Sequence, residues 1–194
     1  MLSVGPDQVF VHPHNIAHLT YSNAAHFTTP AHQDFVLIQG TRVTYTVWLP
    51  LTDFPIGLGG LTKSAGTHKF GILPARAALG AGGFGIDTSI LDYAWHASDL
   101  AAGDILFFHS FTVHKALPNR SGNCFRFSTD TRYQGVSLSI VENGLLSHFN
   151  RLFWDEIYQG WTRRDLPYYW QRLPIKPVPC DPSLREKVLD AGKM

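Results

Sequence analysis

The sequence predicts a mainly β domain, a sandwich or a barrel, followed by a helical C-terminal part. Three features carry this prediction: two segments whose side chains alternate between two faces, a long apolar segment between them, and glycine-rich turns such as PIGLGG and LGAGGFG. Short strands separated by glycine and proline turns are typical of sandwiches and barrels.

The first alternating segment is TRVTYTVWLP, residues 41–50. Alternation with this β-branched and aromatic content predicts a strand. One face carries Arg42, Thr44, Thr46 and Trp48, and the other carries Val43, Tyr45, Val47 and Leu49.

Two more strands are predicted further along the chain. Residues 105–114, ILFFHSFTVH, form an apolar run that follows the turn AAGD. Residues 125–133, FRFSTDTRY, alternate again. One face of this last strand carries Arg126, Ser128, Asp130 and Arg132, and the other carries Phe125, Phe127 and Tyr133.

The C-terminal part, about 143–194, is predicted to be helical. Apolar residues recur at helical spacing over 145–158, between Asn143-Gly144 and Gly160, which predicts an amphipathic helix. A second short helix is expected over 165–173 and an extended proline-rich segment over 174–182. A last helix is expected over 181–190, with Asp181 as N-cap and Pro182 at its first position. These helices are expected either to pack outside the β core or to mediate a homodimer.

The bulk composition indicates one soluble domain over residues 1–194. Hydrophobic residues make up 44% and charged residues 16%, and the formal net charge is +1. Such a balance argues against nucleic acid or an anionic membrane as the main partner. No apolar run is long enough to span a membrane, and the first residues do not resemble a signal peptide. With Cys124 and Cys180 expected as reduced thiols, we expect a cytoplasmic protein.

The stretch TPAHQDF, residues 29–35, raises the question of a metal site. His32 and Asp34 are two apart, so on an extended segment both side chains point the same way. A pair of this kind is also common in exposed polar loops. His114, at the end of the apolar strand, is the candidate for the third ligand, because two histidines and one carboxylate form the facial triad of non-haem Fe(II) oxygenases.

Other residues compete for a role or support this site. His68 is expected in a turn, and His109 is expected to be a packed core residue facing away from His114; His96 is the remaining competitor as a ligand. Arg126 lies on the polar face of its strand, and its planar guanidinium suits a carboxylate. Ser128 shares that face, while the pattern leaves Trp48 open between a core and a pocket role.

Taken together, five segments resemble the phytanoyl-CoA dioxygenase family. They are HQD at 32–34, the tryptophan at 48, GGLTKSAGTHK at 59–69, GDILFFHSFTVHKALPNRSG at 103–122 and RFSTDTRYQ at 126–134. The resemblance implies a double-stranded β-helix, a jelly-roll or cupin-like core. It also implies an Fe(II)- and 2-oxoglutarate-dependent dioxygenase that uses O2 to hydroxylate a small molecule and releases succinate and CO2.

The same resemblance implies roles for single residues. His32, Asp34 and His114 would bind iron, and Arg126 would pair with the far carboxylate of 2-oxoglutarate. Trp48 would lie beside the co-substrate, and Thr29 falls in a stretch that often contacts it.

This chain departs from the family in two places. Ala116 stands where members often have a serine or threonine, and Ser128 is a possible substitute. Members also carry a longer segment before HQD, whereas 31 residues precede it here, which predicts a short form or a missing N-terminal portion.

Two rival functions and one set of residues remain open. One rival is a cupin-type metalloenzyme that does not use 2-oxoglutarate, and the other is a shortened, non-catalytic relative that binds metal or ligand. Arg132, Tyr133 and Gln134 could serve the substrate side or structural pairing.

Overall fold

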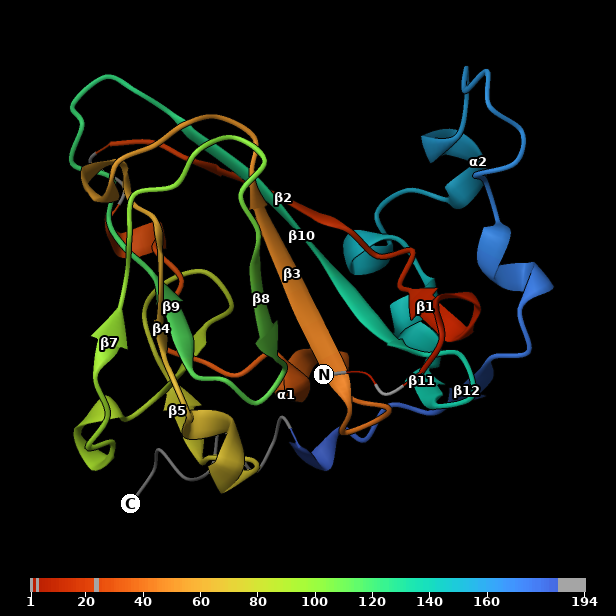
Figure 1. Ribbon diagram of the computed structural model, residues 1–194, viewed down its shortest axis with the longest axis horizontal. Helices are drawn as coiled ribbons and strands as arrows, with labels where there is room; N and C mark the ends of the chain where they lie inside the picture. Colours follow the sequence, from red (N-terminus) through yellow and green to blue (C-terminus); the bar gives the residue numbers. More distant parts are fainter. Residues whose placement is uncertain (1, 3, 23–24, 185–194) are drawn as a thin grey trace.

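The computed structural model describes residues 2, 4–22 and 25–184, and the fold is mainly β, as predicted (Figure 1). The largest sheet has the order β1-β10-β3-β8, and β2 also pairs with β10. A second sheet has the order β7-β4-β9. The strands of the first sheet are β1 (Val9–Val11), β2 (Ile16–Thr20), β3 (Thr44–Pro50), β8 (Leu106–His109) and β10 (Arg126–Gly135). Those of the second are β4 (Leu61–Ser64), β7 (Trp95–His96) and β9 (His114–Ala116).

Two of the predicted strands are confirmed, and their polar faces turn inward. Residues 41–50 contain β3 and residues 125–133 lie mostly in β10, and the two strands pair antiparallel. Thr44, Thr46 and Ser128 are at most 1% exposed, so the interior between the sheets is polar along these strands. Burying polar side chains costs free energy unless they form hydrogen bonds or bind a ligand. This face of the sheet is therefore a candidate site.

The single strand predicted over 105–114 is wrong. The chain leaves the first sheet after β8 and enters the second sheet as β9, because β8 pairs with β3 whereas β9 pairs with β4. The turn between them is held by the backbone N–H of Thr112, which donates to the carbonyl of His109 at 2.7 Å. The sequence does not reveal such a corner, because Phe108 before it and Val113 after it are both buried apolar residues.

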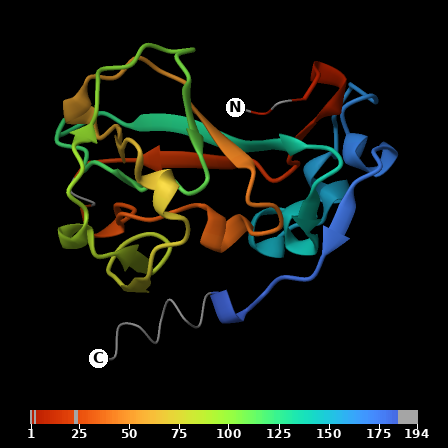
Figure 2. The ribbon, with the colours of Figure 1, turned by 60° about the horizontal axis from the view of Figure 1, so that its bottom comes forward.

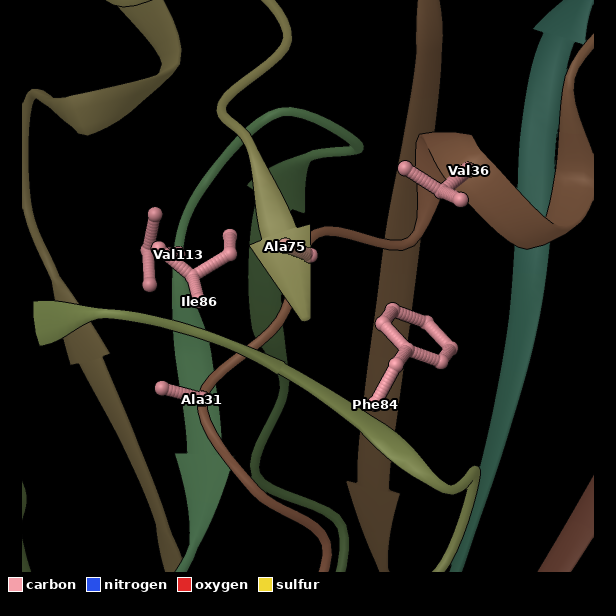
Figure 3. Packing of buried hydrophobic residues seen from close by; sticks show 6 residues of the cluster. All are labelled: Ala31, Val36, Ala75, Phe84, Ile86 and Val113. Carbon is pink, nitrogen blue, oxygen red and sulfur yellow. The ribbon is translucent and has the colours of Figure 1, made fainter. Parts of the chain in front are cut away.

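Apolar clusters fix the position of the interior. Trp48 and Phe108 pack with Phe54 and Leu61 between the two sheets. A second cluster joins the hairpin of β5 (Ala75–Ala77) and β6 (Phe84–Ile86) to the segments before β9 and α1 (Phe35–Ile38), as Figure 3 shows. Its members Ala31 and Val113 immediately precede His32 and His114, so this packing fixes the backbone at both histidines.

The helix predicted over 145–158 is also wrong. The structure has three short helical turns instead, η6 (Glu142–Leu145), η7 (His148–Asn150) and α2 (Trp154–Ile157). Phe149 and Asn150 adopt φ values of +56° and +50°, which end a right-handed helix. The side chain of Trp154 packs instead against Trp170 and donates from Nε1 to the carbonyl of Leu145 at 2.8 Å. Tertiary aromatic contacts therefore override the helical periodicity.

The rest of the C-terminal part packs outside the β core, as predicted (Figures 1 and 2). Phe10, Ile140 and Trp170 form its buried centre, beside β1 and one end of β10. The short helix expected over 165–173 is a 3-10 turn, η8 (Tyr169–Arg172), and the extended segment contains β12 (Lys176–Val178), which pairs in parallel with β11 (Ser139–Val141).

The last predicted helix, over 181–190, lies outside the described residues from position 185 onward. At its start, the backbone N–H of Ser183 donates to Asp181 Oδ1 at 2.9 Å, the contact that an N-cap makes. Cys124 and Cys180 are free thiols. Within the described part of the chain, no helix is long and apolar enough to cross a membrane.

Candidate metal centre

The structure brings His32, Asp34 and His114 together, although 80 residues separate Asp34 from His114 in the sequence. One ligand atom from each residue lies within 4.8 Å of the other two, and all three residues are buried. The backbones at His32 and His114 pair directly, with N···O distances of 2.9 and 3.1 Å. The HQD segment is therefore bound along β9, and the sequence-distant histidine arrives by strand pairing.

Backbone carbonyls orient both imidazole rings. His32 Nδ1 donates to the carbonyl of Pro30 at 2.8 Å, and His114 Nδ1 donates to the carbonyl of Thr112 at 2.9 Å. Because a carbonyl oxygen can only accept, the proton of each neutral ring is on Nδ1 and the lone pair of Nε2 is free. Burial lowers the pKa of His114 to about 4, so this ring stays neutral at pH 7. Neutral rings with a free Nε2 are in the state that a metal ligand requires.

The carboxylate of Asp34 is oriented from behind. Its Oδ2 accepts from Thr46 Oγ1 at 2.5 Å and lies 3.4 Å from Arg132 Nη2. Its Oδ1 lies 3.6 Å from His32 Nε2 and 3.7 Å from His114 Nε2. Burial alone would raise the pKa of Asp34, but Arg132 and the two histidines outweigh it and hold the pKa well below its usual value of 3.8. Oδ1 is therefore the carboxylate oxygen that faces the Nε2 atoms of His32 and His114.

Arg132 is the residue whose importance the sequence left undecided. It is buried between two carboxylates, since its Nη1 donates to Asp130 while its Nη2 faces Asp34. His18 Nε2 lies 2.8 Å from the other oxygen of Asp130. Arg132 therefore makes structural pairs directly behind Asp34, the candidate carboxylate ligand. The signal in the sequence was the alternation that puts Asp130 and Arg132 on one face.

Gln134 and Tyr133 divide between the two sides of β10. The Gln134 side chain is buried, and its Oε1 lies 2.7 Å from His12 Nε2. Tyr133 lies on the opposite face and is half-buried. Thr46 and His12 were not singled out from the sequence as site residues, because threonine on a strand and an isolated histidine carry no specific signal.

Arg126 is a buried cation without an acidic partner among the described residues. Its Nη1 donates to the carbonyl of Gly59, its Nη2 donates to Thr20 Oγ1 at 2.7 Å, and its Nε has no hydrogen-bond partner. Burial lowers its pKa to about 10, which still leaves it charged at pH 7. A buried, charged and incompletely paired guanidinium is what a carboxylate ligand would complete.

The other predicted co-substrate residues lie around Arg126. Ser128 is on the same face of β10, and its buried hydroxyl has no partner in the described structure. The Trp48 ring lies beneath the guanidinium, with Arg126 Cζ 5.8 Å from the ring centroid. Thr29 lies next to Ala116, whose backbone N–H donates to the Thr29 carbonyl at 3.2 Å.

The competing histidines lie apart from the triad. His96 is exposed on β7. His68 and His109 are half-buried and pack against each other with ring centroids 5.6 Å apart. His109 was expected in the core, facing away from His114 on one strand; instead it lies on a different strand of a different sheet.

The donor set fits Fe(II). Two imidazole nitrogens and one carboxylate oxygen meet on one side of a point, which leaves the remaining coordination positions open, and this is the ligand set of non-haem Fe(II) oxygenases. The unpaired guanidinium of Arg126 and the unpartnered Ser128 hydroxyl fit a dicarboxylate such as 2-oxoglutarate. Fold and site together define the class of double-stranded β-helix proteins with a facial triad.

The particular family follows from comparison with known proteins. The family model for phytanoyl-CoA dioxygenase (PhyH) matches residues 6–128, so the chain belongs to this family. A curated relative, 1-deoxypentalenic acid 11-beta-hydroxylase of Streptomyces exfoliatus, is 35% identical over 125 residues, which cover 57% of this chain and 42% of the relative. The same hydroxylase from Streptomyces arenae matches equally, at 35% over 125 residues. The chain thus spans less than half the length of these curated relatives.

Solved structures agree on the fold. EvdO2 from Micromonospora carbonacea var. aurantiaca, complexed with 2-oxoglutarate, is 20% identical with a TM-score of 0.55, over 69% of this chain and 55% of that one. The epimerase SnoN, in complex with Fe3+, alpha ketoglutarate and nogalamycin RO, is 23% identical with a TM-score of 0.53, over 68% and 52% of the two chains. The predicted family is confirmed by the family model, and the jelly-roll fold is confirmed by these structures.

Proposed function

We propose that this protein is an Fe(II)- and 2-oxoglutarate-dependent dioxygenase that hydroxylates a small molecule. The balanced reaction converts a C–H bond, O2 and 2-oxoglutarate into a C–OH group, succinate and CO2. The observation that carries the proposal is the buried, acid-free Arg126 in the same interior as the His32, Asp34 and His114 donors. The curated relative is named as a hydroxylase of a small organic acid, which supports a small-molecule substrate.

Each residue then has a defined task. His32, Asp34 and His114 hold the metal, which supplies O2 activation coupled to decarboxylation of the keto acid. Arg126 binds the far carboxylate of 2-oxoglutarate. Ser128 donates its free hydroxyl to the co-substrate, the task of the serine or threonine that other members have at the position of Ala116. Thr46 and Arg132 keep Asp34 Oδ2 occupied, so that Oδ1 faces the metal. The apolar wall around Trp48 keeps water from the co-substrate.

Two alternatives make different predictions for Arg126. A cupin-type metalloenzyme without 2-oxoglutarate would not need a buried, unpaired guanidinium on the polar face of β10. A non-catalytic relative would bind metal and 2-oxoglutarate but release no product. The unpartnered Nε of Arg126 and the Ser128 hydroxyl favour the dioxygenase over the first alternative.

The test is release of labelled CO2 from 1-¹⁴C-2-oxoglutarate by protein supplied with Fe(II), ascorbate and O2. We expect slow release even without a substrate, and loss of release in His114→Ala and Arg126→Met. His96→Ala is the matched control, since His96 is an exposed histidine outside the triad, and it should release CO2 at the wild-type rate. Binding of 2-oxoglutarate without CO2 release would favour the non-catalytic relative, and iron binding without 2-oxoglutarate binding would favour the cupin-type enzyme.

A further inference from the structure

A cavity of about 620 Å³ lies next to the candidate metal centre, although none of the three triad residues belongs to its lining. Two of its lining residues touch the triad: Phe84 lies edge-on to the His32 ring at 6.3 Å between centroids, and Arg132 pairs with Asp34. Arg126 and Arg132 are six residues apart on one strand face, which corresponds to roughly 20 Å along β10. Arg126 and the cavity therefore lie at different places along β10.

Apolar side chains dominate the wall of this cavity. Val36 and Phe84 are buried at its inner end, whereas Leu37, Leu146 and Phe149 are 39%, 40% and 77% exposed. Apolar residues left this exposed around a hollow mark a place where an apolar molecule is bound. The other apolar lining residues are Ile16, Ile38 and Val141.

The cavity offers no free charge to a ligand. Arg132 is the one charged residue in its lining, among the described residues, and its cation is already paired with Asp34 and Asp130. A phosphate or a carboxylate entering here would lose water without gaining an ion pair. An ammonium group would equally find no acid in the lining.

The polar groups that remain are the imidazoles of His12, His14 and His148 and the side chains of Asn143, Ser147 and Asn150. His14 and His148 line the cavity with ring centroids 5.0 Å apart. Burial, with His148 next to it, lowers the pKa of His14 to about 4, and burial also lowers the pKa of His148 below its usual value of 6.5, so both rings are mainly neutral at pH 7. A neutral imidazole offers one donor and one acceptor, which suits a hydroxyl or a carbonyl group.

We propose that this cavity binds the substrate, and that the substrate is a compact, mainly apolar, uncharged molecule whose oxygen function hydrogen-bonds to the His14–His148 pair. Coenzyme A thioesters and phosphorylated compounds are excluded by the same lining. The identification of the ligand as a substrate rests on the proposed function, whereas the binding preference does not.

Matched probes test the preference for an uncharged ligand. Adamantan-1-ol and adamantane-1-carboxylate share one rigid apolar skeleton and differ in charge. Protein is loaded with Mn(II), whose unpaired electrons broaden the NMR signals of protons bound close to it. We expect broadening of the alcohol and at least tenfold weaker binding of the carboxylate. Equal or tighter binding of the carboxylate, or no broadening of the alcohol at millimolar concentration, would overturn the proposal.

Variants locate the probe within the molecule. Leu146→Trp should fill the cavity and weaken alcohol binding at least tenfold. Leu51→Trp, at a residue that is 46% exposed, directly follows β3 and lies outside the cavity lining, should not. His148→Leu should weaken the alcohol several-fold but leave adamantane itself unchanged. Equal effects of the two tryptophan variants would place the probe elsewhere and overturn the assignment.

The metal centre and the cavity assignment are tested separately. If Mn(II) does not bind, the metal centre is wrong, and calorimetry of both probes with metal-free protein then decides the cavity alone. Alcohol binding that is lost in Leu146→Trp would support the cavity assignment even then, and absence of binding would overturn it. If Mn(II) binds and the alcohol does not, the cavity assignment is wrong and the metal centre stands.

Discussion

Replacing Arg126 with Met separates a ligand-binding role from a structural one. If Arg126 anchors 2-oxoglutarate, the variant should lose co-substrate affinity with little change in the stability of the metal-free protein. A structural arginine would show the opposite result. Arg132→Met is the matched control, because both residues are buried on the same face of β10.

The magnitudes follow from the contacts of each residue. Burial lowers the pKa of Arg126 from 12.5 to about 10, so removing the cation relieves about 3 kcal/mol of desolvation. The variant loses the hydrogen bonds to Thr20 and Gly59, about 1 kcal/mol each, and leaves the Gly59 carbonyl unpaired at a cost of about 1–3 kcal/mol. These terms largely cancel, so the free energy of unfolding should stay within about 2 kcal/mol of wild type. Arg132→Met instead leaves Asp34 and Asp130 as buried charges and should cost about 3–5 kcal/mol.

Calorimetry of 2-oxoglutarate with Mn(II)-loaded protein measures the affinity, and urea unfolding of metal-free protein measures the stability. Truncating one partner of a buried charge pair costs about 2–5 kcal/mol, so the dissociation constant should rise by about 30-fold to several thousand-fold in Arg126→Met. A rise of less than about fivefold together with a large loss of stability would refute the reasoning.

Three further predictions concern the surroundings of the site. Thr46→Val removes the hydroxyl that donates to Asp34, and it should weaken Mn(II) binding about tenfold in calorimetry while leaving the fold intact; unchanged affinity would contradict the orienting role. The pKa of buried His12 is lowered by burial to about 4, below its unfolded value of 6.5, so its contribution to stability is full above pH 6.5 and is lost as the pH falls toward 4. Because the pKa values of His14 and His114 are also lowered to about 4, the wild type should lose more over that window than the share of His12 alone. In urea unfolding, His12→Gln should lose up to about 3 kcal/mol less than the wild type, and an equal loss in both proteins would show that His12 does not contribute. Gly59→Ala should lower both the free energy of unfolding and the 2-oxoglutarate affinity. Gly59 has φ +88°, an added Cβ would meet backbone atoms at 2.7 and 2.8 Å, and the Gly59 carbonyl accepts a hydrogen bond from Arg126. Wild-type values of both quantities would show that this loop adapts.

The two-residue spacing of the sequence sufficed to predict much of the site. Arg126 and Ser128 share a strand face because side-chain direction in a strand depends only on parity. His32 and Asp34 do meet, but not by parity, since Asp34 has the helical dihedrals φ −61° and ψ −33° at the start of α1. The third ligand, His114, could be named only from the end of an apolar run and from the family resemblance. Its actual position depends on pairing between β9 and the HQD segment, a long-range contact that no local pattern contains.

Other parts of the fold could not be read locally for physical reasons. The corner between β8 and β9 depends on long-range pairing, of β8 with β3 and of β9 with β4. The helical spacing over 145–158 is overridden by the packing of Trp154 on Trp170. The histidines of the cavity were visible as a count but not as a group. Only the fold brings His14 to His148 across 133 intervening positions.

The most direct test of the metal centre is an anaerobic titration of the protein with Fe(II) and 2-oxoglutarate, followed by visible absorption. The structure predicts a weak metal-to-ligand charge-transfer band in the wild type that is absent in His114→Ala and present in His96→Ala. A band that persists without the His114 imidazole would place the iron elsewhere, and iron binding with no band in the wild type would remove 2-oxoglutarate from the site.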